Sequence, residues 1–282
     1  MGGASENPPE GLSDLELLEA VVERGGRLDA SAREKLAGVG PIRDDERWRA
    51  PLPLRFEAQL VLLFGGALDA YEVTAAILRD RASQQAFSGI RFLLETLAQI
   101  RWLVEPGGVR ERQVRSYRLL YGQISRWAKL LKEDVAGEPE AIQMIVPIET
   151  WEARLRELAR EDGLQHLKPP PGRSHLLREY GPKSGYPVFS MLSELGAHPS
   201  AVGNLLFSLR PEDRTIDYRI DAAPVERAFW CAVAIVHLWQ TCEGVAEFLG
   251  WNEWLTTEAG PIYNNAASVM DEATRRRRAF GD

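Results

Sequence analysis

Three residues of one short segment have the types and the spacing that acid–base chemistry needs. Ser190, Glu194 and His198 follow one another at intervals of four residues, so they share one face if a helix extends that far. A histidine can act as acid or base near neutral pH, and Glu194 would orient it and stabilise its charged form. Alternatively, His198 only interacts with the carbonyls at a helix end, where a cation is favourable without any function. Both interpretations stay open.

A second candidate site is a charged notch on the most apolar long segment, Ser83–Val104. Its pattern predicts a central helix buried on two sides, since Phe92 and Leu103 point away from the main apolar face. That face comprises Phe87, Ile90, Leu94, Leu97 and Val104. Arg91 and Glu95 lie on the flank as i, i+4 neighbours and can pair. The pair either fixes the register of the helix, which we favour, or forms a polar notch for an anionic ligand.

Arginines gather at two helix ends. Arg115 and Arg118, with Arg110 and Arg112, occupy the first turns of a helix predicted from residue 109 to 135. Cations are unfavourable at a helix amino terminus, so these arginines either form a solvated face or bind an anion or nucleotide. The run Arg275–Arg278 ends the last predicted helix, where capping is favoured over binding of nucleic acid or acidic lipid because the chain is acidic.

The sequence predicts no metal site and no cofactor. Its four histidines include no i, i+4 pair of the kind that holds zinc on a helix. It contains no nucleophile elbow, Walker loop or Rossmann fingerprint. Cys231 and Cys242 stand eleven residues apart in one predicted helix, about 16 Å along its axis, so they cannot bridge within it. Free buried thiols are typical of a reducing cytosol.

Composition indicates a water-soluble cytoplasmic protein. The chain has 282 residues, of which 45% are hydrophobic, and a net charge of −7, enough for one large domain or two small ones. The amino-terminal residues MGGASENPPEGL lack the basic and apolar regions of a signal peptide. Because no apolar run reaches the roughly 20 residues that span a bilayer, we expect no membrane association.

Periodicity and capping signals predict an all-α fold: a multi-helix bundle with a small β-hairpin insert and an N-terminal helical arm. The arm consists of two short helices separated by Gly25-Gly26, then a linker anchored by Trp48. The β-favouring residues over 204–210 and 215–221, with a four-residue turn between them, predict the hairpin. We expect residues 1–50 to form a disordered tail and the arm, and residues 51–282 to form the main helical-bundle domain, with the proline loop 163–172 as an internal boundary.

A family resemblance starts from Arg91–Glu95, which reads R-F-L-L-E, and from Arg115, Tyr117 and Arg118 in the next helix. Tyr186, then Ser190 or Ser193, then His198 follow in order. Over about residues 54–250, this resembles an uncharacterised bacterial all-helical domain, distantly similar to the HEPN class. That class includes ribonucleases of toxin–antitoxin and defence systems and non-catalytic relatives. Catalytic HEPN domains carry an arginine four to six residues before the histidine, which this chain lacks before His198.

Three functional hypotheses follow. The leading one is a binding, regulatory or dimerising module that recognises a protein partner or a second copy of itself. Its polar site would comprise Arg91, Glu95, Tyr186, Glu194 and His198. The resemblance implies the second, an RNA-cleaving enzyme in which His198 is the acid or base and Arg91 stabilises phosphate charge. The third is an anion or nucleotide binder. An apolar surface patch would favour the binding module. A juxtaposition of Arg91 and His198 would favour the RNA-cleaving enzyme, and arginines around a concavity would favour the anion or nucleotide binder.

Overall fold

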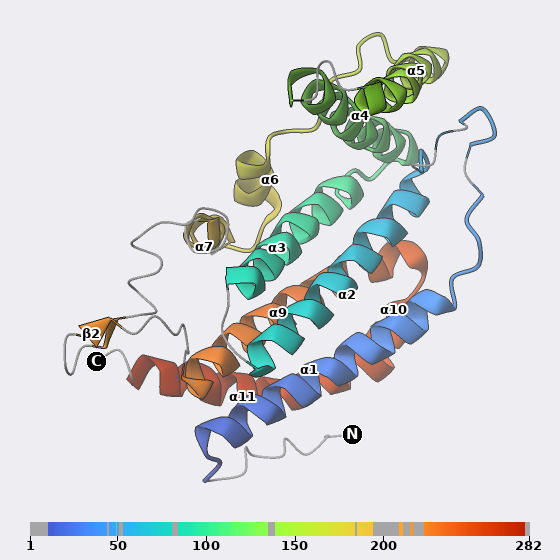
Figure 1. Ribbon diagram of the computed structural model, residues 1–282. Helices are drawn as coiled ribbons and strands as arrows, with labels where there is room; N and C mark the ends of the chain where they lie inside the picture. Colours follow the sequence, from blue (N-terminus) through green and yellow to red (C-terminus); the bar gives the residue numbers. More distant parts are fainter. Residues whose placement is uncertain are drawn as a thin grey trace.

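A computed structural model of the chain describes residues 11–43, 45–48, 50, 53–80, 84–134, 139–183, 185–193, 209–210, 215–216 and 223–279. The described chain is predominantly helical, which confirms the all-α prediction (Figure 1). The main bundle consists of α1 (Asp14–Ala37), α2 (Phe56–Asp80), α3 (Gln84–Val104), α9 (Pro224–Leu249) and α11 (Gly260–Ala279). The short α10 (Asn252–Trp254) and the π-helix η2 (Leu255–Ala259) connect α9 to α11.

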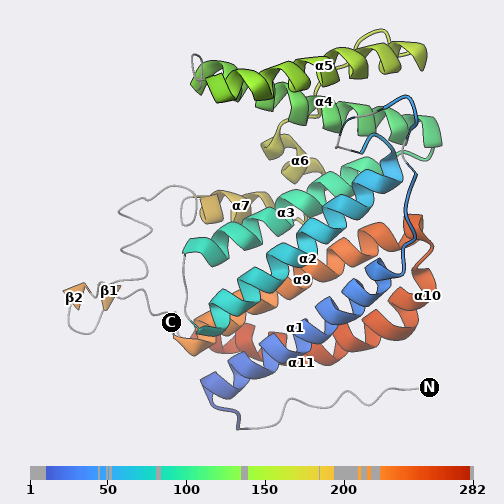
Figure 2. The ribbon, with the colours of Figure 1, turned by 45° about the vertical axis from the view of Figure 1, so that its right-hand side comes forward.

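The remaining helices lie on one side and at one end of this bundle. A helical pair, α4 (Val109–Asp134) and α5 (Pro139–Glu161), lies across the end where α2 begins and α3 finishes (Figure 2). Two short helices, α6 (Arg173–Tyr180) and α7 (Gly185–Leu192), pack against α3. The chain between α5 and α6 therefore brings the proline loop back toward the bundle.

The central helix has the predicted burial with one exception. Phe87, Ile90, Leu94 and Leu97 are buried on α3, which packs against α2 and α9 on one side and α6 and α7 on the other. Leu103 is buried as expected, whereas Phe92 is 47% exposed. The expectation of a fully covered second face was therefore wrong at Phe92, because the neighbouring helices leave a hollow at this position.

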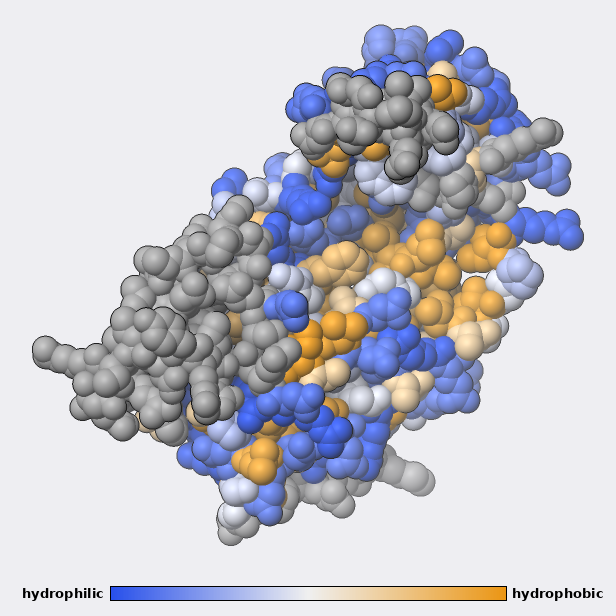
Figure 3. Space-filling model, viewed as in Figure 1, coloured by the Kyte–Doolittle hydropathy of each residue, from blue (hydrophilic) through white to orange (hydrophobic). Residues whose placement is uncertain are grey.

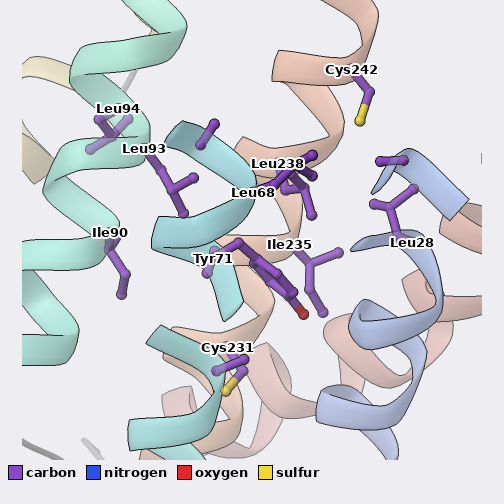
Figure 4. Close-up of a cluster of buried hydrophobic side chains, with 14 of the residues drawn as sticks. Leu28, Leu68, Tyr71, Ile90, Leu93, Leu94, Cys231, Ile235, Leu238 and Cys242 are labelled. Atoms are coloured by element: carbon purple, nitrogen blue, oxygen red, sulfur yellow. The ribbon is translucent and has the colours of Figure 1, made fainter. Parts of the chain in front are cut away.

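The amino-terminal helix differs from the two short helices that we expected. Ser13 and Glu16 form the capping box at its start, but α1 continues through Gly25-Gly26 as one helix. A Cβ at Gly25 would lie 2.0 Å from the Tyr71 hydroxyl and 2.6 Å from Ile235 Cγ1. Figure 4 shows Tyr71 of α2 and Ile235 of α9 reaching toward α1. This glycine therefore permits a close helix contact, so it does not stop the helix.

Because of this contact, α1 belongs to the main core. It packs against α2, α9 and α11 and buries Leu17, Leu18, Val21 and Leu28 completely. The amino-terminal helical segment is thus an integral member of the bundle. This is expected of a segment that has no hydrophobic core of its own. The division of the chain at residue 50 and at the proline loop stays a prediction.

A second, smaller core lies between α4 and α5. It is formed by Tyr117, Leu120 and Ile124 of α4 and by Leu155 and Leu158 of α5. Trp48, only 6% exposed, inserts into it from the segment that connects α1 to α2. This confirms Trp48 as the anchor of the linker.

The structure describes only four residues of the predicted hairpin. β1 (Leu209–Arg210) and β2 (Thr215–Ile216) form an antiparallel ladder of two residues each, with Leu209 opposite Ile216. This ladder does not establish the predicted insert, since the rest of residues 204–221 lies outside the described residues. The hairpin insert stays a prediction.

One described helix, α2, is long and apolar enough to cross a membrane, with a mean hydropathy of 1.6 over its most apolar window. The core helices of water-soluble proteins pass the same test. α2 packs against α1, α3 and α9. The cytoplasmic location stays a prediction.

Candidate functional site

A pocket of about 550 Å³ lies where α3, α4, the proline loop and the first turn of α6 meet. Both predicted residues of the central helix, Arg91 and Glu95, line it. Arg126 and Arg173 line it as well, together with Gln99 and Gln123. The pocket therefore combines residues that are up to 113 positions apart in the chain (Leu63 and Leu176).

The charged part of the pocket is built around Glu95. Arg91 donates from Nε to Glu95 Oε1 at 3.0 Å, which confirms the predicted i, i+4 pair. Arg173 of α6 reaches the same carboxylate, with Nη1 at 3.3 Å from Oε2. The Glu95 side chain is only 11% exposed. A largely buried carboxylate thus holds two arginines of different helices at the pocket wall.

The pocket is cationic in an acidic protein. Arg126 of α4 is exposed, and no hydrogen bond or ion pair of its side chain is found among the described residues. Three arginines and one glutamate give the pocket lining a net charge of +2, whereas the whole chain has −7. A concave, low-dielectric wall with charge of one sign concentrates the electric field on a ligand of the opposite sign.

The other walls of the pocket are apolar. Phe92 and Leu63 contribute from α3 and α2, Leu119 from α4 and Leu176 from α6. Pro169, Pro170 and Pro171 close one side. A Cβ at Gly122 would lie 2.5 Å from Pro170 Cδ, so the proline loop packs directly on the backbone of α4. The loop predicted as an internal boundary is therefore also a wall of this pocket.

The amino-terminal end of α6 opens toward the pocket. Gly172 occupies the N-cap position and provides no side-chain hydrogen bond, and Gly172 and Arg173 both line the pocket. The backbone amides of His175 and Leu176 already bond to the Gly172 carbonyl, at 2.9 and 3.0 Å. The uncapped first turn adds positive potential beside Arg173.

The predicted acid–base segment is described only in part. Glu194 and His198 lie outside the described residues, so their proposed roles stay predictions. Ser190 is exposed on α7, and Tyr186 packs under the Arg178 guanidinium at 4.2 Å. Arg91 lies 4.7 Å above the Phe189 ring. The structure thus brings Arg91 against α7, the helix that precedes His198.

The arginines at the start of α4 contact protein groups. Arg115 pairs with Glu105 at 2.7 Å and lies over the rings of Trp102 and Tyr180. Arg118 also lies over Trp102 and donates to the Pro169 carbonyl at 3.1 Å. Burial lowers the pKa of Arg118. These contacts connect α4 to α3, to α6 and to the proline loop, so they favour a structural role over an anion site at Arg115 and Arg118.

The carboxy-terminal arginines also pair within the fold. Arg275 and Arg276 both bind Glu272 at 2.6 Å, and Arg276 reaches Asp14 of α1 at 2.8 Å. Arg277 binds Glu226 of α9 at 3.0 Å. Their side chains thus tie α11 to α1 and α9, which is a more specific role than the predicted capping of carbonyls.

One histidine is deeply buried away from the pocket. His237 of α9 is 6% exposed, and neither ring nitrogen has a hydrogen-bond partner among the described residues. Burial is the main cause that lowers its pKa to about 4; Gln240 opposes this shift, and the nearby Arg101 adds to it. Within the described part of the chain, no group of three or more histidine, cysteine or acidic side chains is arranged to hold a metal ion.

Comparison with known proteins does not suggest a function, so a function has to be argued from the geometry of the pocket and the surface. No family model, curated protein or solved structure matches this chain. The resemblance to HEPN domains accordingly stays an expectation from short motifs.

Sequence reasoning located Arg91 and Glu95 but missed Arg126, Arg173 and the proline wall. Two signals pointed to that wall. Gly122 stands in the interior of α4, and an interior helix glycine often marks a close approach. Consecutive prolines form a stiff extended segment that suits a wall. Nothing in the sequence pairs Arg173 with Glu95, because that contact depends on how the chain returns after α5.

Proposed function

We propose that this protein is a binding module that pairs with an apolar helix of a partner, in the simplest case a second copy of the chain. The proposal rests on one observation, the uncovered apolar stripe of α2. Leu62 is 58% and Val73 is 57% exposed, and Phe92 of α3 is uncovered as well. The α2 stripe consists of Leu62, Gly66, Ala70, Val73 and Ile77, of which Leu62 and Val73 are exposed and the other three are partly buried.

The spacing of the α2 stripe suits another helix. Its members follow at intervals of four, four, three and four residues, which is the seam by which helices pack along each other. Gly66 and Ala70 lack bulk and allow close approach. Hydrophobic residues gather on the face over α2 and α3, below the α4–α5 pair (Figure 3). Large uncovered apolar patches on soluble proteins mark interaction sites.

A neighbouring groove extends this surface. It has a volume of about 410 Å³ and lies between the end of α1, the linker and α2. Leu62 belongs to both the groove and the α2 stripe, and every lining residue is apolar or glycine, including Leu36, Val39, Ile42 and Val61. In a two-fold symmetric dimer the same stripe of each copy would meet its counterpart, and the groove would receive side chains from the partner.

Self-association can be tested with a matched control. We expect the wild-type protein to change from monomer to dimer across a concentration series in light scattering after size exclusion. Replacing Leu62→Glu and Val73→Glu together should leave a monomer, because two charges would be buried at the seam. Leu15→Glu on α1 is the control, since Leu15 is 55% exposed outside the stripe. A wild type that stays monomeric, or a double variant that still dimerises, would contradict the proposal.

The HEPN-like ribonuclease remains the second candidate, supported by the position of Arg91 against α7. It predicts growth arrest and RNA cleavage on induced expression of the wild type, relieved by His198→Ala. Absence of arrest, together with absence of cleavage by the purified protein, would contradict it. Either function suits a reducing cytoplasm, because Cys231 and Cys242 are both buried free thiols.

A further inference from the structure

We infer that the pocket between α3, α4 and the proline loop binds a small organic anion with an apolar body. This site adjoins the α2 stripe through Phe92, which lies beside Gly66, but its arginines lie outside the stripe, and the inference does not depend on dimerisation. The ligand's carboxylate or phosphate monoester would contact the arginines, and its alkyl or aromatic part would lie against the apolar walls.

The arginines retain donors for a ligand. Each guanidinium carries five N–H donors. Glu95 engages Nε of Arg91 and Nη1 of Arg173, and Arg126 has no ion pair among the described residues. Glu95 therefore keeps two guanidinium groups in position without using all their donors. Carboxylates and phosphates are the groups that arginine binds through two parallel hydrogen bonds.

The net charge of the pocket lining indicates the sign of the ligand's charge. With three cations against one anion in its lining, the pocket repels a cation and attracts an anion, although the rest of the protein is acidic. The uncapped turn at Gly172 and Arg173 adds to the same sign. A purely structural cluster would leave Arg126, which has no ion pair among the described residues, without a role.

The apolar walls indicate that the part of the ligand away from its charged group is apolar. Phe92, Leu63, Leu119 and Leu176 face the same space as the arginines, with three prolines opposite. The volume of about 550 Å³ lies within the range of small-molecule sites, which are mostly apolar with a few convergent polar groups. Covering Phe92 would remove one of the most exposed aromatic side chains from water, which favours a ligand with an apolar body.

The probes are decanoate, decyl phosphate, decyltrimethylammonium and inorganic phosphate, with binding measured by titration calorimetry. We expect decanoate or decyl phosphate to bind, and the alkyl cation and inorganic phosphate each to bind at least about tenfold more weakly. The stronger of the two anions identifies the head group as carboxylate or phosphate. Equal binding of the alkyl cation, or no binding of either alkyl anion, would overturn the inference.

Charge variants locate the site. Arg126→Glu should weaken binding of the alkyl anion about tenfold or more, since it removes a cation and adds an anion. Arg110→Glu is the matched control because Arg110 is exposed on the same helix outside the pocket. Glu95→Gln should strengthen binding, because glutamine keeps an oxygen that accepts from the arginines and removes the negative charge that repels the anion. Equal losses in Arg126→Glu and Arg110→Glu would overturn the inference, and urea unfolding checks that each variant is folded.

Discussion

The two hydrophobic cores of this protein are held together in different ways. The main bundle core is formed by long helices that pack directly on one another, with α2 between α1, α3 and α9. The core of α4 and α5 is a single layer between two helices, completed by Trp48 from the linker. The helices of the main bundle bury their own core, whereas the core of α4 and α5 is completed by a residue of the linker between α1 and α2.

Polar contacts surround the smaller core. Arg47 binds Asp45 at 2.6 Å and Asp162 at 3.1 Å, and the Tyr117 hydroxyl donates to the same Asp162. These contacts fasten the linker to the end of α5. Polar contacts also join α4 to α2 of the main bundle: Gln59 donates to the Ser116 carbonyl at 3.1 Å, and the Phe56 backbone amide donates to Gln113.

This difference explains where the candidate ligand pocket lies. Within the bundle, close packing leaves little space, as the contact of Gly25 with Tyr71 and Ile235 shows. At the seam between the two cores, arginines and prolines meet the helices around the pocket of about 550 Å³. The seam therefore has both space and charge.

The largest expected effect is on the smaller core. Trp48→Ala should destabilise the packing of the linker on α4 and α5 by about 3 kcal/mol, because it empties the centre of a thin core. Hydrogen exchange measured by mass spectrometry should show lost protection in α4 and α5 with α2 and α9 unchanged. Trp127→Ala is the control, since Trp127 of α4 is 44% exposed. Equal loss of protection in α2 and α9 would show that the two cores unfold as one unit.

The main core contains a titratable group whose burial has a cost. The pKa of His237 is about 4 in the folded protein and about 6.5 in the unfolded chain. Above pH 6.5 the group is neutral in both states. As the pH falls from 6.5 to 4, only the unfolded chain takes up the proton, so stability decreases by about 3 kcal/mol across this window.

Unfolding in urea at a series of pH values measures this effect. The loss of stability between pH 6.5 and 4 should be smaller in His237→Leu than in the wild type, because the substitution removes the proton-binding group. His175→Leu is the control, since His175 is exposed on α6 and should retain the wild-type profile. Identical pH profiles for all three proteins would show that His237 is not shielded from water.

The smallest expected effect compares two adjacent glycines of α1. Gly25→Ala should destabilise the protein by about 2 kcal/mol, because the added methyl group would collide with Tyr71 and Ile235. Gly26→Ala has no atom within 4 Å of its new Cβ and should be neutral or stabilising by up to about 1 kcal/mol. Urea unfolding of the two variants measures the difference. Equal stabilities would show that α1 does not pack as closely as its position in the core requires.

Local signals predicted most of the helices but not their partners. The central helix, the capping box of Ser13 and the Arg91–Glu95 pair involve residues within a few positions of one another, where periodicity and spacing are informative. Gly25-Gly26 was interpreted as a helix stop because glycine has a low helix propensity. The structure instead uses Gly25 for a contact with α2 and α9, and sequence spacing contains no information about such distant neighbours.

The sequence by itself determined the fold class, the central helix and one charged pair, since each follows from apolar period and local charge spacing. Only the tertiary structure placed α1 in the bundle, drew Trp48 into a second core, left the α2 stripe uncovered and brought Arg126 and Arg173 to Arg91. The physical reason is that these features arise from contacts between segments far apart in the chain. Those contacts depend on the packing of whole helices, which no local pattern specifies.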